Sequence, residues 1–206
     1  LRRPLAMYVL TIDQARSRRS PDRVPELLAA LSDVGVLAPF ERTVGDEVQG
    51  VPADAAAALA AIRICLAEGG WHIGLGAGAG VLGRDGAARS GSGRAFLAAR
   101  EAVEAAKRAR TSVAVRAAHA PEKAAQAQAL LRLIGALVRG RSVGQREVVA
   151  LVARGMSGKQ IAQRLGVTEQ AVSKRRLASA FDEEVEALPL TTALIEALSP
   201  ESGGAP

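Results

Sequence analysis

Three acidic residues in the first half of the chain combine the residue types and the spacing that a divalent metal site needs. Asp13 follows an extended run at 8–12, and Asp46 and Glu47 lie at a tight turn between two further extended runs. Where such strands are neighbours in a sheet, their carboxylates meet at one end of it. Paired carboxylate oxygens suit Mg²⁺, which keeps several waters and binds together with phosphate groups. The pattern predicts that Asp13 and Asp46 bind Mg²⁺.

Three arginines add a second kind of contact to this site. Arg16, Arg18 and Arg100 can bind phosphate or balance the carboxylates. A purely structural interpretation stays open beside this one. In it, Asp13 caps a turn, the hairpin acids are merely solvated, and Arg100 pairs with Asp46.

Residues 157–176 have the pattern of two short helices joined by a tight turn. Ala162 is small, so a second helix can cross close to the first. Gly166 supplies the positive φ that ends the first helix, and Thr168 is placed to cap the second. The apolar residues that face the inside of this corner are Ile161, Leu165, Val167 and Val172. The pattern predicts a helix-turn-helix that binds DNA or, as the alternative, a helical hairpin used for packing or dimerisation.

The outward face of this corner carries residues suited to duplex DNA. Eight basic and two acidic residues lie between 141 and 176, so the region is locally basic, as phosphate contact requires. Gln170, Ser173 and Lys174 are predicted to read base edges in the major groove. The residues predicted to neutralise phosphates are Arg141, Arg146, Lys159, Arg164, Lys174 and Arg175. The complete predicted DNA-binding set is Lys159, Arg164, Thr168, Glu169, Gln170, Ser173, Lys174, Arg175 and Arg176.

The composition argues against several other functions. The chain has 206 residues, of which 49% are hydrophobic and 23% charged, the balance of a folded globular protein. Its net charge of +6 favours a polyanionic partner. Aromatic residues make up only 2%, which argues against single-strand binding by base stacking. One cysteine and two histidines exclude an internal disulfide and a His/Cys zinc site. No apolar run is long enough to span a membrane, so we expect a cytoplasmic protein.

Strand-like and helix-like segments alternate in the first region, residues 1–139. This alternation predicts an α+β sheet layered with helices. Strands are expected at 8–12, 40–44, 48–51, 71–76 and 111–117, and helices at 21–31, 54–67, 94–109 and 121–139. The first of these helices is expected to have Ser20 as its N-cap and Pro21 at its first position.

The second region, residues 140–198, has no strand-like segment and is expected to be a small all-α domain. Helices are expected at 145–153, 159–165, 169–180 and 191–198, with Pro189 interrupting the chain before the last one. Residues 199–206 are rich in Ser, Gly and Pro and are expected to be a disordered tail.

Several small or apolar residues have predicted structural roles. Cys65 is expected to be a small buried hydrophobe, and Trp71 a core residue. Gly74, Gly76 and Gly78 alternate along a strand and leave room for a ligand or for a closely packed helix. A further apolar stripe at helical spacing is formed by Leu130, Leu131, Ile134, Leu137 and Val138. It docks on the sheet or pairs with a second copy, and a dimer suits DNA half-sites one helical turn apart.

Two parts of the chain resemble known families. Residues 145–175 resemble the helix-turn-helix of sigma-factor region four and LuxR-type domains, in which a helix ending in glycine and serine precedes the corner. The segments 12–18, 45–50, 73–78 and 90–103 resemble, in that order, the SatD-like proteins of bacteria. Their layout is similar to that of GGDEF-type and class III nucleotide cyclases. This resemblance implies a ferredoxin-like or palm-type sheet that holds a divalent metal and a nucleoside triphosphate.

Together these features predict a cytoplasmic bacterial transcriptional regulator. Residues 1–139 form a SatD-like, cyclase-like domain that dimerises, senses a nucleotide, or does both, and residues 140–198 bind double-stranded DNA. A homodimer is expected, and no membrane partner. One alternative is a Mg-dependent nucleotidyl cyclase or nucleotidyltransferase that uses Asp13 and Asp46, with the helical region as a targeting module. The other is a catalytically dead scaffold that only holds two DNA-binding tails together.

Overall fold

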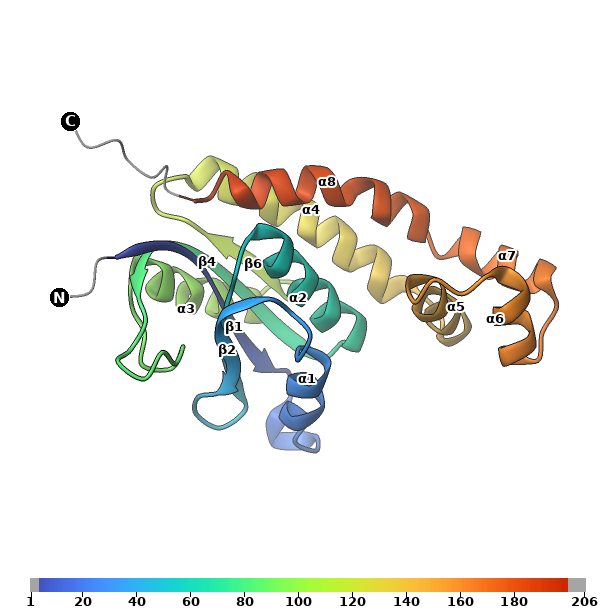
Figure 1. Ribbon diagram of the computed structural model, residues 1–206, viewed down its shortest axis with the longest axis horizontal. Coiled ribbons are helices and arrows are strands. Elements are labelled where there is room, and N and C mark those ends of the chain that lie inside the picture. The colour runs from blue at the N-terminus through green and yellow to red at the C-terminus, as the bar shows by residue number, and fades with distance from the viewer. Residues whose placement is uncertain (1–3, 200–206) are drawn as a thin grey trace.

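The computed structural model describes residues 4–199, with the side chain of Arg18 left out. A mixed six-stranded sheet layered with helices is followed by a run of helices that extends to one side (Figure 1). The strands are β1 (Leu5–Gln14), β2 (Val36–Arg42), β3 (Glu47–Pro52), β4 (Trp71–Val81), β5 (Ser92–Gly93) and β6 (Val113–Arg116). The helices are the short 3-10 helix η1 (Ser17–Arg19), α1 (Val24–Ala30), α2 (Ala55–Glu68), α3 (Arg94–Lys107), α4 (Pro121–Gly140), α5 (Val143–Ala153), α6 (Gly158–Leu165), α7 (Glu169–Ala178) and α8 (Phe181–Glu196). The predicted α+β class is confirmed.

Strand β1 is the central strand of the sheet. The strand order is β2-β3-β1-β4, and both β5 and β6 pair with β4. All neighbours run antiparallel except β6, which lies parallel to β4. In this register Asp13 of β1 lies between Glu47 of β3 and His72 of β4. The sheet therefore brings three ionisable side chains into one row at the end of β1.

The main core lies between one face of the sheet and four helices. Leu10 and Ile12 of β1 pack there with Ile62 of α2, Leu131 of α4 and Ile195 of α8, all of them fully buried. The other face is covered by α3 and by the loop that precedes it. Helix α8 thus lies over the same core as the helices of the first region, although it comes last in the chain.

Two glycines allow α3 to lie directly on β4. A Cβ atom at Gly74 would come within 2.3 Å of the backbone nitrogen of Val103, and one at Gly76 within 2.2 Å of the backbone nitrogen of Ala99. Both distances are far below van der Waals contact, so no other residue fits at either position. Of the two predicted uses of this glycine stripe, room for a ligand or for a closely packed helix, the structure has the second.

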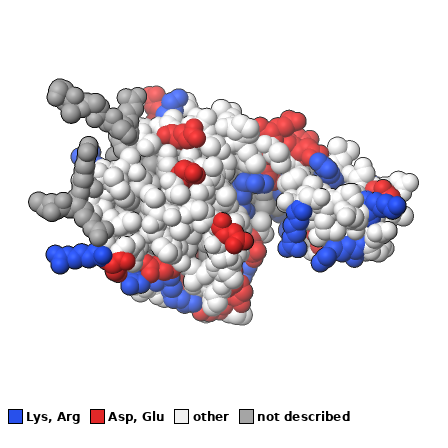
Figure 2. All heavy atoms as spheres, in the orientation of Figure 1, with Lys and Arg blue, Asp and Glu red and all other residues white. Residues whose placement is uncertain are grey.

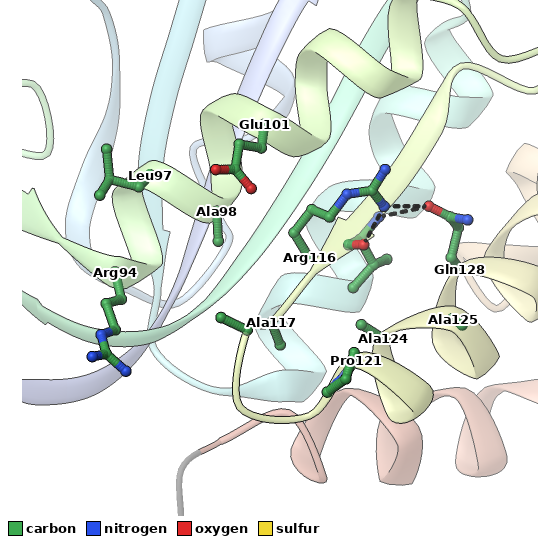
Figure 3. A pocket seen from close by; sticks show the side chains of 12 residues that line it. Arg94, Leu97, Ala98, Glu101, Arg116, Ala117, Pro121, Ala124, Ala125 and Gln128 are labelled. Carbon is green, nitrogen blue, oxygen red and sulfur yellow. Dashed lines mark hydrogen bonds between the residues drawn. The ribbon is translucent and has the colours of Figure 1, made fainter.

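Both edges of the sheet have features that oppose pairing with another strand. Edge strand β2 contains Pro39 and two register shifts. On β6, side chains occupy the outer backbone groups. The Gln128 amide oxygen accepts from Val115 N at 3.2 Å, and the Arg132 guanidinium donates to the Val113 carbonyl at 2.9 Å. Figure 3 shows Arg116 turned toward Gln128, to which it donates at 3.1 Å.

Some predicted helix and strand boundaries are wrong, and contacts between distant residues explain the differences. The first helix begins at Val24 because the Ser20 hydroxyl accepts from Gln14 and donates to the Arg16 carbonyl, so it does not cap. Strand β4 continues past the predicted end to Val81, pairing with β1 along its whole length. Helix α8 is continuous through Pro189, whose side chain is exposed. Packing against α2 and α4 outweighs the missing hydrogen bond.

No helix within residues 4–199 combines the length and the hydropathy needed to cross a membrane. The predicted disordered tail falls almost entirely outside the described residues, which end at 199.

The contact between β4 and α3 makes a quantitative prediction. Gly76→Ala forces a methyl group into the backbone of α3, and we expect it to lower the free energy of unfolding by about 3 kcal/mol. Gly140→Ala, in the last turn of α4, meets no atom within 4 Å and is the control, expected to leave stability unchanged or slightly raised. Urea unfolding of both variants measures this. Equal stability of the two would contradict the close packing.

Candidate functional site

Helices α5, α6 and α7 form a compact three-helix unit with its own small core. Val148 of α5, Ile161 of α6 and Val172 of α7 are buried against one another. Leu165 and Val167, at the corner between α6 and α7, pack on this cluster. The predicted inward residues of the corner are therefore confirmed.

The ends of these helices are capped by the residues that precede them. The Ser157 hydroxyl accepts from Gln160 N, and the Gln160 amide oxygen accepts in return from Ser157 N at 2.8 Å. The Thr168 hydroxyl accepts from Ala171 N at 3.1 Å, as predicted for the cap of α7. Gly166 ends α6 with a φ of 65°, the left-handed conformation that glycine adopts without strain. Local sequence thus dictates the angle between α6 and α7.

Most of the predicted DNA-binding residues are exposed on this unit. Figure 2 shows Lys and Arg side chains gathered at this end of the molecule. The exposed members of the predicted set are Lys159, Arg164, Thr168, Glu169, Gln170, Ser173, Lys174 and Arg176. Arg175 is half-buried, and Arg176 forms an ion pair with Asp182 at 2.7 Å.

Arg141 does not lie on this surface, which corrects its predicted phosphate contact. It is 7% exposed, and its guanidinium donates to Glu184 at 2.6 Å and to the Ser179 carbonyl at 2.9 Å. It also lies 5.9 Å from the centre of the Phe181 ring. Its charge is used to hold the start of α5 against the start of α8, so it is not available to DNA.

Glu184 joins the three-helix unit to the sheet body. It is 2% exposed and accepts from Arg141 on one side and from Arg63 of α2 at 2.7 Å on the other. A buried carboxylate with two arginine partners has its hydrogen bonds satisfied, but it becomes costly if either partner is lost. Because α4 and α8 also run side by side to the unit (Figure 1), the joint contains both polar and apolar contacts.

A second group of charged residues surrounds the end of β1. The Lys107 ammonium, at the last turn of α3, lies 3.0 Å from the Asp13 carboxylate and 2.8 Å from that of Glu104. Burial opposes the charge on Lys107, but these two hydrogen bonds outweigh it and raise the pKa of the ammonium. Burial lowers the pKa of His72, against the opposite effect of Asp13. Lys107 is therefore charged, and His72 is mainly neutral at pH 7.

These residues line an open pocket of about 990 Å³. Asp13, His72 and Lys107 form one part of its wall, and Arg16 and Arg19 the other. Arg16 has a left-handed backbone, with a φ of 60° and a ψ of 28°, which costs a non-glycine residue about 1 kcal/mol. The His72 Nδ1 atom is buried and has no hydrogen-bond partner in the described part of the chain.

The structure brings only part of the predicted nucleotide and metal set to this pocket. Asp13 and Arg16 line it, while Arg18 has no described side chain. Glu47 lies beside Asp13 in the sheet register and accepts from the Thr43 hydroxyl at 2.6 Å. The remaining members, Asp46 at the hairpin turn and Arg100 on the exposed side of α3, do not line the pocket.

The Asp13 carboxylate is engaged by a cation of the chain itself. Within residues 4–199, no three His, Cys, Asp or Glu side chains are grouped so that they could hold one. The Asp13 carboxylate is paired with Lys107, whose ammonium lies where a cation would bind. The pocket has instead an excess of cationic groups.

Three residues of this pocket were missed by sequence analysis. Lys107 and Arg19 are 94 and 6 positions from Asp13 and belong to no recognisable motif with it. His72 could not be assigned to the site from sequence, because its register opposite Asp13 depends on the sheet order. Only the signal at the end of β1, where a strand leads into an arginine-rich turn, was available from sequence.

Comparisons with known proteins add little to this geometry. No family model matches the chain, and no curated protein matches it. Among solved structures, the chain is similar to a regulator of polyketide synthase expression from Bifidobacterium adolescentis, with 14% identity and a TM-score of 0.32, covering 96% of this chain and 82% of that one. No conclusion about this chain rests on a likeness this distant. The resemblances to SatD-like proteins and to LuxR-type domains stay predictions.

The buried ion pairs at the joint predict that Glu184 contributes much more to the free energy of unfolding than the nearby Asp182 does. Glu184→Ala leaves the buried Arg141 guanidinium without its carboxylate, and we expect a loss of about 3 kcal/mol in the free energy of unfolding. Asp182→Ala removes an exposed partner of Arg176 and should cost no more than about 1 kcal/mol. Chemical denaturation checks both variants. A similar small loss in the two would mean that Glu184 does not hold the joint.

Proposed function

We propose that this chain is a sequence-specific DNA-binding regulator of transcription, in which α7 enters the major groove of double-stranded DNA. One observation carries the proposal: α6 and α7 form a corner held by its own core and caps, and the outer side of α7 is polar. Val172 is the buried residue of α7, so the helix gives almost all of its surface to solvent. A helix used only for packing would bury an apolar stripe.

The exposed residues of α7 have the chemistry for base recognition. Gln170 and Ser173, which lie near the start of the helix, carry neutral hydrogen-bonding groups. Amide and hydroxyl groups at the start of a recognition helix are the ones that reach base edges in the major groove. Lys174 can contact a base or a phosphate. These side chains support sequence-specific rather than purely electrostatic binding.

Basic residues around the corner supply phosphate contacts in this proposal. Lys159 and Arg164 of α6 are exposed, and no hydrogen bond or ion pair of their side chains occurs within the described residues. Arg146 is exposed as well, although it donates to the Arg141 carbonyl at 2.7 Å. Exposed cationic side chains next to a recognition helix are the kind of group that holds a protein on the DNA backbone.

The proposal includes a second copy of the chain. One side of α4 packs on the sheet body, as predicted for its apolar stripe, through Leu131, Ile134 and Val138. On the opposite side of α4, Leu133 is 64% and Leu137 40% exposed. These two leucines support a homodimer, which would place two recognition helices on two half-sites.

We also propose a more specific fold type for the sheet. The order β4-β1-β3-β2, with α1 and α2 as crossovers, is that of a split βαβ sheet of the ferredoxin-like type. In this proposal the sheet is a scaffold that positions the helical unit. The alternative role, a Mg-dependent nucleotidyl cyclase or nucleotidyltransferase, is less favoured, because Asp13 pairs with Lys107 and Asp46 does not line the pocket at the end of β1.

Base recognition is tested on DNA selected from a genomic pool. We expect a discrete site with two half-sites about one helical turn apart. Ser173→Ala and Gln170→Ala should each weaken binding to that site by about 1 to 3 kcal/mol and leave binding to unrelated DNA unchanged. Lys123→Ala, on the exposed start of α4, is the control. If no site is enriched, the proposal is wrong; a single half-site would contradict the dimer alone.

Phosphate contacts are tested by the salt dependence of binding. Lys159→Ala and Arg164→Ala should weaken binding to all sequences equally and should each reduce the slope of log K against log salt by about 1. Lys123→Ala should leave the slope as it is. Fluorescence anisotropy with a short duplex at several salt concentrations measures this. An equal loss of slope in the control would show that net charge, and not this surface, determines binding.

A further inference from the structure

We propose that the open pocket at the end of β1 binds the phosphate group of a small phosphorylated molecule through its arginine side chains, without a metal ion. The pocket lies on the sheet body, at the end of β1 in Figure 1, and is formed by residues outside the three-helix unit. The inference goes beyond DNA binding and does not depend on it.

The charges that line the pocket are suited to a doubly charged anion. The Asp13 carboxylate is already neutralised by Lys107 at 3.0 Å. Neither the Arg16 nor the Arg19 guanidinium has a hydrogen bond or ion pair with any side chain that the structure describes. Two free guanidinium groups match the charge of a phosphate monoester, and each can donate two parallel hydrogen bonds to phosphate oxygens.

The backbone at Arg16 favours a functional role for this arginine. Its left-handed conformation favours glycine, yet the chain has an arginine here. The local turn uses only the Arg16 carbonyl, which accepts from Arg19 N at 2.8 Å and from the Ser20 hydroxyl at 3.1 Å. The strained residue thus has a side chain that the fold does not use, which is typical of binding positions.

His72 adds a polar atom that lacks a partner. Its Nδ1 is buried without a hydrogen bond, and its ring lines the same pocket. Buried polar atoms without partners are rare in folded proteins, so the ring has unused hydrogen-bonding capacity beside the pocket.

The shape of the pocket favours a small molecule over a nucleic acid backbone. Its volume of about 990 Å³ is at the upper end of the range for small-ligand sites. It is open to solvent, and it contains a carboxylate in contact with an ammonium, a pair that contact with DNA phosphates alone does not require. Binding of duplex DNA in this pocket is the alternative that the experiment below tests.

Calorimetric titration of the full chain with inorganic pyrophosphate, in the presence of EDTA, tests the proposal. We expect saturable binding at one site. Arg16→Gly and Arg19→Ala should each weaken it at least tenfold. Arg100→Ala is the matched control, because Arg100 is an exposed arginine of α3 that does not line the pocket, and it should change the affinity by less than twofold.

The Arg16→Gly variant separates a binding role from a structural one. Glycine fits the backbone conformation at this position, so the melting temperature should stay the same or rise. A loss of pyrophosphate binding without a loss of thermal stability supports the proposal. A fall in the melting temperature together with the affinity would assign the arginine a structural role and overturn it.

Four other outcomes would overturn the proposal. They are the absence of binding by pyrophosphate and by ADP at millimolar concentration, binding that requires added Mg²⁺, equal weakening by Arg100→Ala, and a loss of duplex DNA affinity in Arg16→Gly as large as the loss of pyrophosphate affinity. The last would place the pocket on the DNA-binding surface. None of the pyrophosphate measurements uses DNA, so failure of this proposal is distinguishable from failure of the DNA-binding one.

Discussion

The contact between β4 and α3 determines the placement of much of the molecule. Gly74 and Gly76 have no side chains, so the backbone of α3 rests directly on the central part of the sheet. This contact leaves α3 little freedom to slide, because a shift by one residue would move its alanines out of the glycine positions. The end of α3 is thereby held beside the end of β1, and Lys107 reaches Asp13. The absence of side chains at Gly74 and Gly76 therefore also helps to position the charged pocket at the end of β1.

The joint between the sheet body and the three-helix unit is a second constraint, and it is polar. Glu184 is buried between Arg63 of α2 and Arg141, the residue that follows α4. A buried ion pair adds little net stability compared with apolar packing, but it tolerates only one arrangement of its partners. The two ion pairs therefore connect α2, the end of α4 and the start of α8 through one carboxylate. Helix α8, which follows the unit, returns along α4 to the main core through Ile195.

Features that depend on neighbouring residues could be predicted from the sequence, whereas features that depend on residues far apart in the chain could not. Gly166 and Thr168 act on their own neighbours, so the corner between α6 and α7 was predictable residue by residue. The class of the sheet followed from alternating segments. Arg141, in contrast, looked like a phosphate ligand because its partner Glu184 lies 43 positions away. The same holds for the charged pocket, where strand register places His72 beside Asp13. Pro189 was expected to interrupt a helix, but α8 continues through it, because the packing that holds α8 together is not visible in the sequence.

The side chains that cover β6 protect one edge of the sheet from pairing with another chain. Gln128 and Arg132 come from α4, so the outer backbone groups of β6 stay covered only while that helix is in place. Local melting of α4 exposes a short, apolar, parallel edge strand, the kind of surface from which intermolecular β-structure grows. Because Leu131 of the same helix is buried in the main core, this edge is exposed only when the core itself opens.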